Sequence, residues 1–239
     1  MTILKTIFNT ILDALFPRTT SELESLSYSP EQAWQKLPHA PRPPLPRTDS
    51  IFAYKDEKVA KLVWNIKYKK SAKAIAIGGY ALRLRLVELI KKHVTSIFQN
   101  FVIIPIPITK RRKNERGYNQ CELLVNEIER LDIDKKFIIC KDLLGRVHHL
   151  SRQTLKNRED RLESAKGIFT VNEETRKRIM NEDNQIGNEL EIINSENNID
   201  NTIIIVIDDV ITTGSTMKEA METLQNAGFK NVFGLSLAH

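Results

Sequence analysis

The sequence predicts an α/β fold in which a mostly parallel sheet is flanked by helices, and two observations lead to this prediction. Residues 101–104 and 203–207 are unbroken apolar runs rich in β-branched side chains, a pattern typical of strands buried on both faces. Each run is followed by a segment whose apolar residues recur with helical spacing. Because strand and helix alternate along the chain, a parallel sheet is the simplest architecture.

A chain of 239 residues suits one such domain with an N-terminal appendage. We assign residues 1–50 to the appendage and residues 51–239 to the folded domain. The appendage opens with an amphipathic helix of about 16 residues, shorter than the roughly 20 apolar residues of a membrane span, and without the cleavage pattern of a signal peptide. Ser29 and Pro30 predict the start of one short helix in an otherwise irregular segment. A Pro-rich, extended connector follows over residues 37–47.

The spacing of apolar residues predicts the remaining elements. They are helices over residues 56–67 and 71–93, a helix opened by Asn119 or Gln120, and strands over residues 136–141 and 168–171. Residues 172–201 are acidic and rich in Asn, and a long segment of this composition predicts a mobile insertion in the domain.

The cysteine content limits the cellular setting. The 2 cysteines, Cys121 and Cys140, occur without a secretory signal, which indicates a reducing compartment and argues against a disulfide framework or a cysteine-rich zinc site. We therefore expect a cytoplasmic protein without a transmembrane segment.

The most informative segment begins at the apolar run 203–207. Asp208 and Asp209 follow the predicted strand, then comes the hydroxyl-rich turn of residues 212–216, and a helix with apolar residues at helical spacing starts directly after it. Such a turn leaves backbone N–H groups free at the positive end of a helix, and Gly214 lets the backbone approach a ligand closely. A phosphate fits this point, and the two acids beside it can hold ribose hydroxyls directly or through a divalent cation. Taken singly, the acid pair suits a polar loop and the turn suits a helix cap.

A second segment carries basic residues to the end of the other buried strand. Residues 105–120 read PIPITKRRKNERGYNQ, and we expect a loop whose cations neutralise a pyrophosphate; a solvated loop is the structural alternative. The segment belongs to a larger basic block, residues 66–116, which holds 13 Lys and Arg against Glu88 and Glu115. A block of this charge attracts phosphates or a nucleic-acid backbone.

Several of these motifs together resemble the ComF family, the competence-associated, phosphoribosyltransferase-like proteins. PIPITKRRKNERGYNQ is similar to the VPVP, basic run and RGFNQ of that family, and residues 203–229 closely resemble the PRPP-binding motif of type I phosphoribosyltransferases. Residues 146–169 resemble the family pattern with Arg146, Gln153, Arg161, Gly167 and Phe169 in register. The family usually has a four-cysteine zinc ribbon after FP, where this chain reads RTTSELESLSYSPEQAW, so no zinc is expected.

The resemblance implies a type I phosphoribosyltransferase-like fold and a site for 5-phosphoribosyl 1-pyrophosphate (PRPP) with Mg²⁺. Asp208 and Asp209 would be the catalytic and Mg²⁺-binding acids, through the ribose hydroxyls or water. The remaining residues implied in PRPP binding are Thr212, Thr213, Gly214, Ser215 and Thr216 for the 5′-phosphate, Lys110, Arg111 and Arg112 for the pyrophosphate, and Arg161 on a closing loop.

Three functions remain open at this stage. The first is an enzyme that transfers a phosphoribosyl group to an amine or a base, with a role in competence and DNA uptake. The second is a binding protein of the DNA-uptake machinery, in which the basic block tracks single-stranded DNA. The third is a regulator that binds PRPP without turnover.

Overall fold

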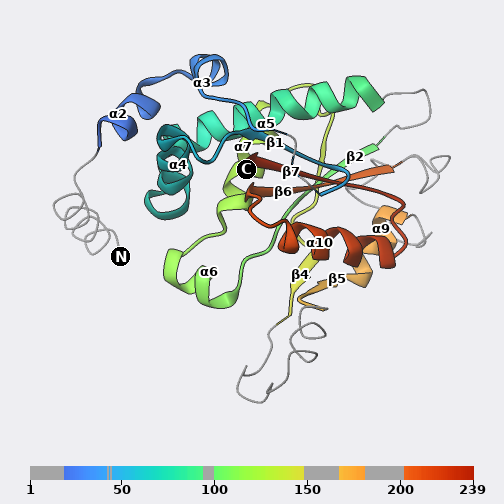
Figure 1. Ribbon diagram of the computed structural model, residues 1–239. Helices are drawn as coiled ribbons and strands as arrows, with labels where there is room; N and C mark the ends of the chain where they lie inside the picture. The colour runs from blue at the N-terminus through green and yellow to red at the C-terminus, as the bar shows by residue number, and fades with distance from the viewer. Residues whose placement is uncertain (1–18, 42, 44, 94–99, 148–166, 181–201) are drawn as a thin grey trace.

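The computed structural model describes residues 19–41, 43, 45–93, 100–147, 167–180 and 202–239 (Figure 1). Its centre is a five-stranded sheet in the order β1-β7-β6-β2-β3, in which all neighbouring strands are parallel. The predicted α/β class with a parallel sheet is therefore confirmed. The strands are β1 (Thr48–Phe52), β2 (Asn100–Pro105), β3 (Ile138–Ile139), β6 (Thr202–Val210) and β7 (Asn231–Ala238).

The two apolar runs form the middle of this sheet. Strands β2 and β6 pair directly, and successive side chains of each strand enter separate apolar clusters on the two faces. Ile203 and Ile205, for example, pack on one face, whereas Ile204 and Val206 pack on the other. A strand buried on both faces needs apolar residues without alternation, which explains the pattern in the sequence.

Helices cover both faces of the sheet, as Figure 1 shows. One face carries α4 (Glu57–Trp64), the π-helix η1 (Asn65–Lys69), α5 (Ala72–His93) and α7 (Gln120–Leu131). The other face carries α10 (Ser215–Asn226), α9 (Glu173–Met180) and an antiparallel pair, β4 (Leu144–Arg146) with β5 (Phe169–Val171). Among the described residues, we find no helix whose length and apolarity suit a membrane span.

The appendage contributes more structure than its sequence indicated. The helix predicted at Ser29 is α3 (Pro30–Lys36), and a capping box between Ser29 and Gln32 stabilises its N-terminus. A second helix, α2 (Thr20–Ser27), lies where we expected irregular chain, and it packs against α4. The side chain of Asn65 in η1 donates a hydrogen bond to the carboxylate of Glu22 at 3.0 Å, which ties the appendage to the domain. The amphipathic helix expected at the N-terminus lies outside the described residues.

Two further segments differ from the sequence prediction. Where we expected a basic loop, α6 (Lys110–Arg116) forms a short helix, because Thr109 caps its first turn and Gly117, at φ 78°, ends it. The first part of the expected mobile insertion is the helix α9, which buries Thr175 and Met180. Residues 181–201 lie outside the described part.

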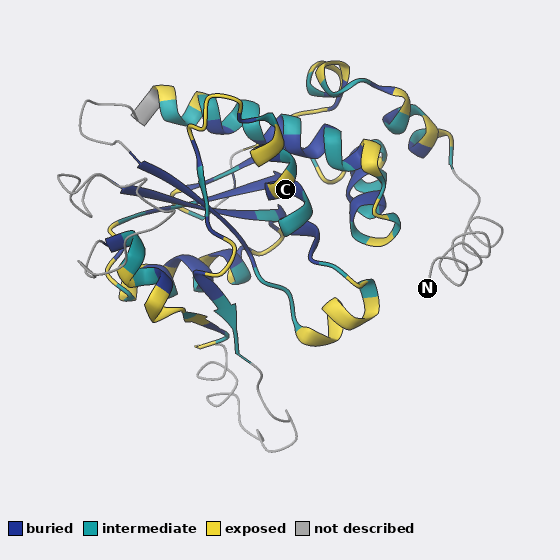
Figure 2. Cartoon of the chain, turned by 180° about the vertical axis from the view of Figure 1, so that it is seen from behind, coloured by how far each residue is buried: buried dark blue, intermediate teal, exposed yellow. Residues whose placement is uncertain are grey.

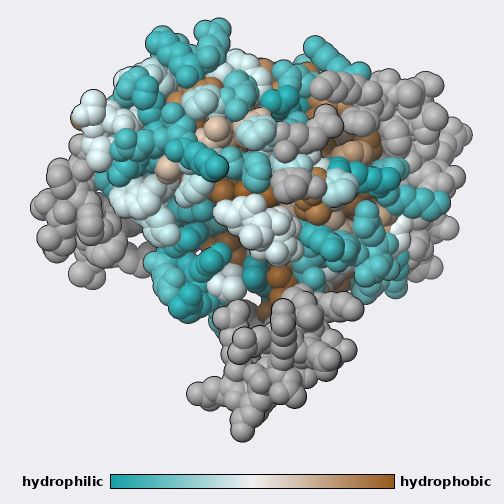
Figure 3. All heavy atoms as spheres, in the orientation of Figure 1, coloured by the Kyte–Doolittle hydropathy of each residue, from teal (hydrophilic) through white to brown (hydrophobic). Residues whose placement is uncertain are grey.

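The strands of the sheet are more deeply buried than the elements around them (Figure 2). The strands of the five-stranded sheet are mostly buried, whereas α6 stands off the body and has no buried residue. The face drawn in Figure 3 is mainly hydrophilic, with apolar residues confined to gaps between polar side chains. The exposed cations of α6 thus lie beside the carboxyl edge of the sheet.

Candidate functional site

A cavity of about 960 Å³ lies at the carboxyl edge of the sheet, where β2 and β6 end. In an open parallel sheet this edge is the usual place for ligands. Its lining joins residues from distant parts of the chain: Tyr54, Lys67, Tyr68, residues 106–112, Arg116, Gln120, Arg146, Val147, Ile168, residues 208–210, Thr212 and Thr216.

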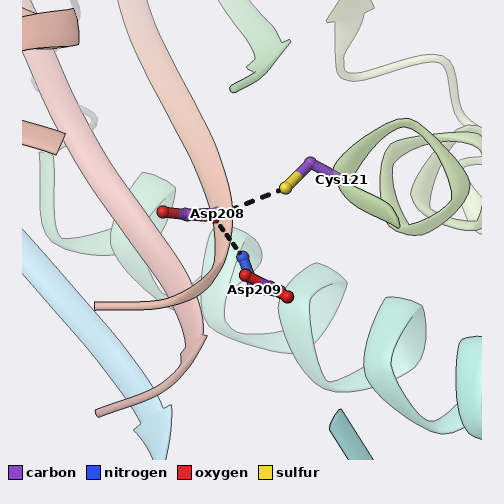
Figure 4. Close-up of side chains that lie close together, drawn as sticks. All are labelled: Cys121, Asp208 and Asp209. Atoms are coloured by element: carbon purple, nitrogen blue, oxygen red, sulfur yellow. Dashed lines mark hydrogen bonds between the residues drawn. The ribbon is translucent and has the colours of Figure 1, made fainter. Parts of the chain in front are cut away.

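The acid pair lies at the base of this cavity, and its two members differ. Strand β6 continues through Val210, so both acids are strand residues whose carboxylates point apart (Figure 4). Asp208 is partly buried and accepts hydrogen bonds from the backbone N–H of Asp209 at 2.8 Å and from the Cys121 thiol at 3.5 Å. Asp209 is only 4% exposed, and its Oδ2 lies 2.9 Å from the Nζ of Lys67. The fold thus gives one of the two acids an internal counter-ion.

The different surroundings of the two acids shift the pKa values of the groups around them. Burial, and then the charge of Asp209, raises the pKa of the Asp208 carboxyl to about 7. Burial also raises the pKa of the Cys121 thiol well above its ordinary value, and the two acids add to this effect. For Lys67, burial works to lower the pKa, but the charge of Asp209 and its hydrogen bond outweigh burial, so the pKa is raised. Lys67 therefore keeps its charge beside Asp209, and the Cys121 thiol stays protonated.

Beside Asp208, residues 212–216 form a small recess of about 40 Å³ that we call the cradle. Gly214 has φ 78° and is the N-cap of α10, yet no side chain caps the first turn of this helix. The first turn also contains no acidic residue. The backbone N–H of Ser215 donates to Thr213 Oγ1 at 3.4 Å, and the positive end of this 12-residue helix faces the cradle, where it can attract an anion. Asp208, Val210, Thr212 and Thr216 line both the cradle and the large cavity, so the two spaces adjoin.

The opposite side of the cavity is positively charged. We call α6 and its cap Thr109 the arm; Lys110, Arg111 and Arg112 of the arm line the cavity, and the Arg111 side chain is 82% exposed. Arg146 on β4 adds a cation that is more buried, with its Nη1 donating to the carbonyl of Pro107 at 3.3 Å. Burial and then the nearby charge of Arg112 lower the pKa of Arg146. Arg161, which we also implicated, lies outside the described residues.

Among the residues that line the site, several escaped the sequence prediction. They are Tyr54, Lys67, Tyr68 and Gln120, whereas Arg116 is one of the cations of the basic segment that we expected at the site. Lys67 belongs to the basic block of residues 66–116, but the charge of that block did not indicate which of its cations lie at the site. In the structure, Lys67 and Tyr68 lie on the π-helix η1 and line the cavity.

The acids offer suitable ligands for a hard divalent cation. The nearest ligand atoms of Cys121, Asp208 and Asp209 all lie within 4.8 Å of one another. Mg²⁺ prefers oxygen, so the carboxylates fit it and the protonated thiol does not. Because Asp209 already faces Lys67, Asp208 is the acid whose carboxylate is available to a cation or to hydroxyl groups.

Comparison with known proteins agrees with this geometry. Residues 158–235 match the phosphoribosyl transferase domain family, a range that contains the acid pair and the cradle. The chain is 30% identical over 139 residues to Competence protein F of Haemophilus influenzae, covering 57% of this chain and 50% of that protein. It is 28% identical over 130 residues to Competence protein ComFC of Bacillus subtilis, covering 54% of this chain and 40% of that protein. The matched regions thus span half or less of these relatives.

Proposed function

We propose that the chain is a ComF-like member of the phosphoribosyltransferase-like proteins, that it binds PRPP with Mg²⁺ and that it transfers the phosphoribosyl group to an acceptor, in a role linked to competence. The similarity to a phosphoribosyl transferase domain and to two competence proteins supports this proposal. One observation carries this proposal: a helix N-terminus at the cradle adjoins a cavity that is lined by an acid pair and a cluster of cations. PRPP has the same order of groups, a phosphate, a ribose with two hydroxyls, and a pyrophosphate.

The cradle would take the 5′-phosphate. The protein supplies no counter-charge to this helix end, because the first turn of α10 contains no acid and its N-cap, Gly214, has no side chain. The hydroxyl of Thr213 already contacts that of Ser215 at 2.9 Å, so these two groups are held in position around the recess. Thr216 would contribute its hydroxyl from the side that faces the acids.

Asp208 would hold the ribose hydroxyls and a Mg²⁺ ion, which supplies charge neutralisation to the pyrophosphate when bound. Asp209 would act mainly through Lys67, because its Oδ2 lies 2.9 Å from the Nζ of Lys67. Lys110, Arg111, Arg112 and Arg146 would face the pyrophosphate. In the reaction, a nucleophilic atom of the acceptor bonds to C1 of the ribose and the C1–O bond breaks. Its electron pair leaves with pyrophosphate, and the acceptor releases a proton to solvent.

A second candidate function rests on the arm. Its cations are exposed and extend beyond the acid pair, which favours binding of single-stranded DNA along α6. Salt-sensitive binding of an oligonucleotide, lost when arm cations are replaced, would support this function.

The double variant Asp208→Asn with Asp209→Asn tests PRPP binding, and we expect it to abolish Mg²⁺-dependent affinity in calorimetry. The single variant Asp208→Asn keeps the Lys67–Asp209 ion pair and separates loss of a ligand from loss of a buried ion pair. Asp134→Asn is the matched control, because Asp134 is 63% exposed and does not line the cavity. Unchanged affinity in the double variant would refute the assignment. Release of pyrophosphate in the presence of acceptors distinguishes an enzyme from a PRPP-binding regulator.

A further inference from the structure

A buried carboxylate outside the cavity joins the appendage to the folded domain. Helix α2 lies against α4, the helix that leads into η1 (Figure 1). Glu22 on α2 is only 3% exposed, and no described residue of α2 lines the cavity. Its Oε1 accepts a hydrogen bond from Asn65 Nδ2 at 3.0 Å and lies 3.6 Å from Lys69 Nζ, and both partners belong to η1. Because a buried carboxylate is costly unless it is paired, these contacts hold α2 and η1 in one arrangement.

Asn65, the first residue of η1, holds this π-helical turn together. Its side-chain amide is buried and donates to the carbonyl of Lys61 at 2.9 Å as well as to Glu22. Its backbone carbonyl accepts from the N–H of Lys70, at the end of η1, and from that of Ser71 at 3.2 Å. Lys70 has φ 50°, a left-handed conformation that is unfavourable for a residue with a side chain. A wide turn that ends in this way depends on contacts from its surroundings.

The same turn carries the counter-ion of the acid pair. Lys67 follows Asn65 on η1, and its Nζ lies 2.9 Å from Asp209 Oδ2 at the base of the cavity. Lys69 on the same turn reaches Glu22 of the appendage. The two lysines thus pair with acids from β6 and from α2. Because the direction of a side chain follows the backbone that carries it, a change in the shape of η1 moves Lys67 away from Asp209.

We propose that Glu22 and Asn65 are positioning residues, which hold η1 in the shape that keeps Lys67 against Asp209, and that the appendage in this way sets the affinity of the site for PRPP. The inference rests on the proposed function, since the ligand is the one proposed above. Without its counter-ion, the buried charge of Asp209 repels the phosphates of the ligand. Loss of a residue that supports a metal-binding site from outside commonly lowers its affinity about 10- to 100-fold.

Chemical labelling of lysines on the full chain tests the positioning without any ligand. A trace of acetic anhydride acetylates the amines, and mass spectrometry compares the rate at Lys67 with that at Lys218, whose side chain is 61% exposed. An amine paired with a carboxylate keeps its proton, so we expect Lys67 to react at least about tenfold more slowly than Lys218 in the wild type. Glu22→Leu should raise the rate at Lys67 about fivefold, because the amine then loses part of its pairing. Glu22→Gln keeps an acceptor for Asn65 and should stay within about twofold of the wild type.

Glu24→Leu is the matched control on the same helix. Glu24 also ties α2 to the domain, but its Oε1 accepts from Lys58 Nζ on α4, at 2.5 Å, rather than from η1. We expect this variant to leave the labelling of Lys67 unchanged. Calorimetry with Mg²⁺ and PRPP should show about tenfold weaker binding in Glu22→Leu and less than about twofold weaker binding in Glu24→Leu. Circular dichroism verifies the fold, and if Glu22→Leu does not fold, Asn65→Leu tests the same contact with the same expected results.

The outcomes separate this inference from the proposed function. An unchanged rate at Lys67 in Glu22→Leu overturns the positioning and leaves the PRPP site standing. An equal rise in Glu24→Leu overturns it as well, because any loosening of α2 would then expose Lys67. If the rate rises but Glu22→Leu binds PRPP as tightly as the wild type, the appendage does not set the affinity and the inference fails. If the wild type binds no PRPP, the proposed function fails, and the labelling alone decides whether Glu22 positions Lys67.

Discussion

The cradle and the arm follow two paired strands at the same edge of the sheet, yet their positive potential comes from different groups. Helix α10 behind the cradle buries Met217, Ala220, Met221 and Leu224, whereas no residue of α6 in the arm is buried. The cradle therefore offers backbone N–H groups at fixed positions, and the arm offers side-chain charges that solvent and salt screen. The difference indicates that the cradle selects a ligand by geometry and the arm attracts it by charge.

The largest expected effect comes from breaking the cradle. Gly214 sits at φ 78°, a conformation that is a genuine outlier for a β-branched residue, so Gly214→Val forces the turn into another shape. Each charge-assisted hydrogen bond lost is worth about 1.5–3 kcal/mol, and we expect PRPP affinity to fall more than about 100-fold. Calorimetry measures the loss, and circular dichroism verifies the fold. Gly117→Ala, at the same φ of 78° but at the end of α6, is the control. An equal loss of PRPP affinity in this variant would show that the cradle and the arm do not differ in how they bind the ligand.

A smaller effect is expected from neutralising the arm. Arg111→Gln with Arg112→Gln removes two exposed cations from the cavity lining, and we expect PRPP affinity to fall about tenfold with little change in stability. The salt dependence of binding should weaken together with affinity. Lys113→Gln on the same helix lies outside the cavity lining and should change affinity less than about twofold. If Lys113→Gln lowers PRPP affinity as much as the double variant does, the arm acts through its net charge alone.

The smallest expected effect is the pH dependence of PRPP affinity, which we attribute to Asp208 beside the cradle. Asp208 has a pKa raised to about 7 by burial and by the charge of Asp209, so its charged form dominates above that value. PRPP affinity should therefore fall about twofold from pH 8 to pH 7. Stability should change in the other direction, because the folded state retains a proton that the unfolded state has released; it falls as the pH rises from about 4 toward 7.

Calorimetry and denaturant titrations at several pH values measure the two trends separately. Asp208→Asn removes the titrating group and should flatten both of them. If the wild-type affinity for PRPP does not change between pH 6 and pH 8, Asp208 is not the acid that holds the ligand. Lys113→Gln again provides a variant that keeps the acid pair unchanged.

Much of the fold was predictable because its signals are local. The apolar runs indicated the two central strands, and the spacing in residues 71–93 indicated α5. The sequence did not predict the short strand β4, because three residues are too few to show a pattern. It did not predict the helix α6 either, because this segment is a run of charged residues whose helix signals are limited to Thr109 and Gly117. The helix α9 was hidden by its polar composition, which is that of a loop even though Met180 is buried.

By itself the sequence determined the acid pair, the cradle after it and the basic segment, because each is a contiguous motif attached to a strand. The tertiary structure alone decided that the acids differ, since Lys67 and Cys121 reach Asp209 and Asp208 from other helices. It also decided that Tyr54 and Tyr68 face the same cavity as the cradle. The physical reason is that a motif records the conformation of its own backbone, whereas the charge and shape of a site depend on side chains that packing brings from distant parts of the chain.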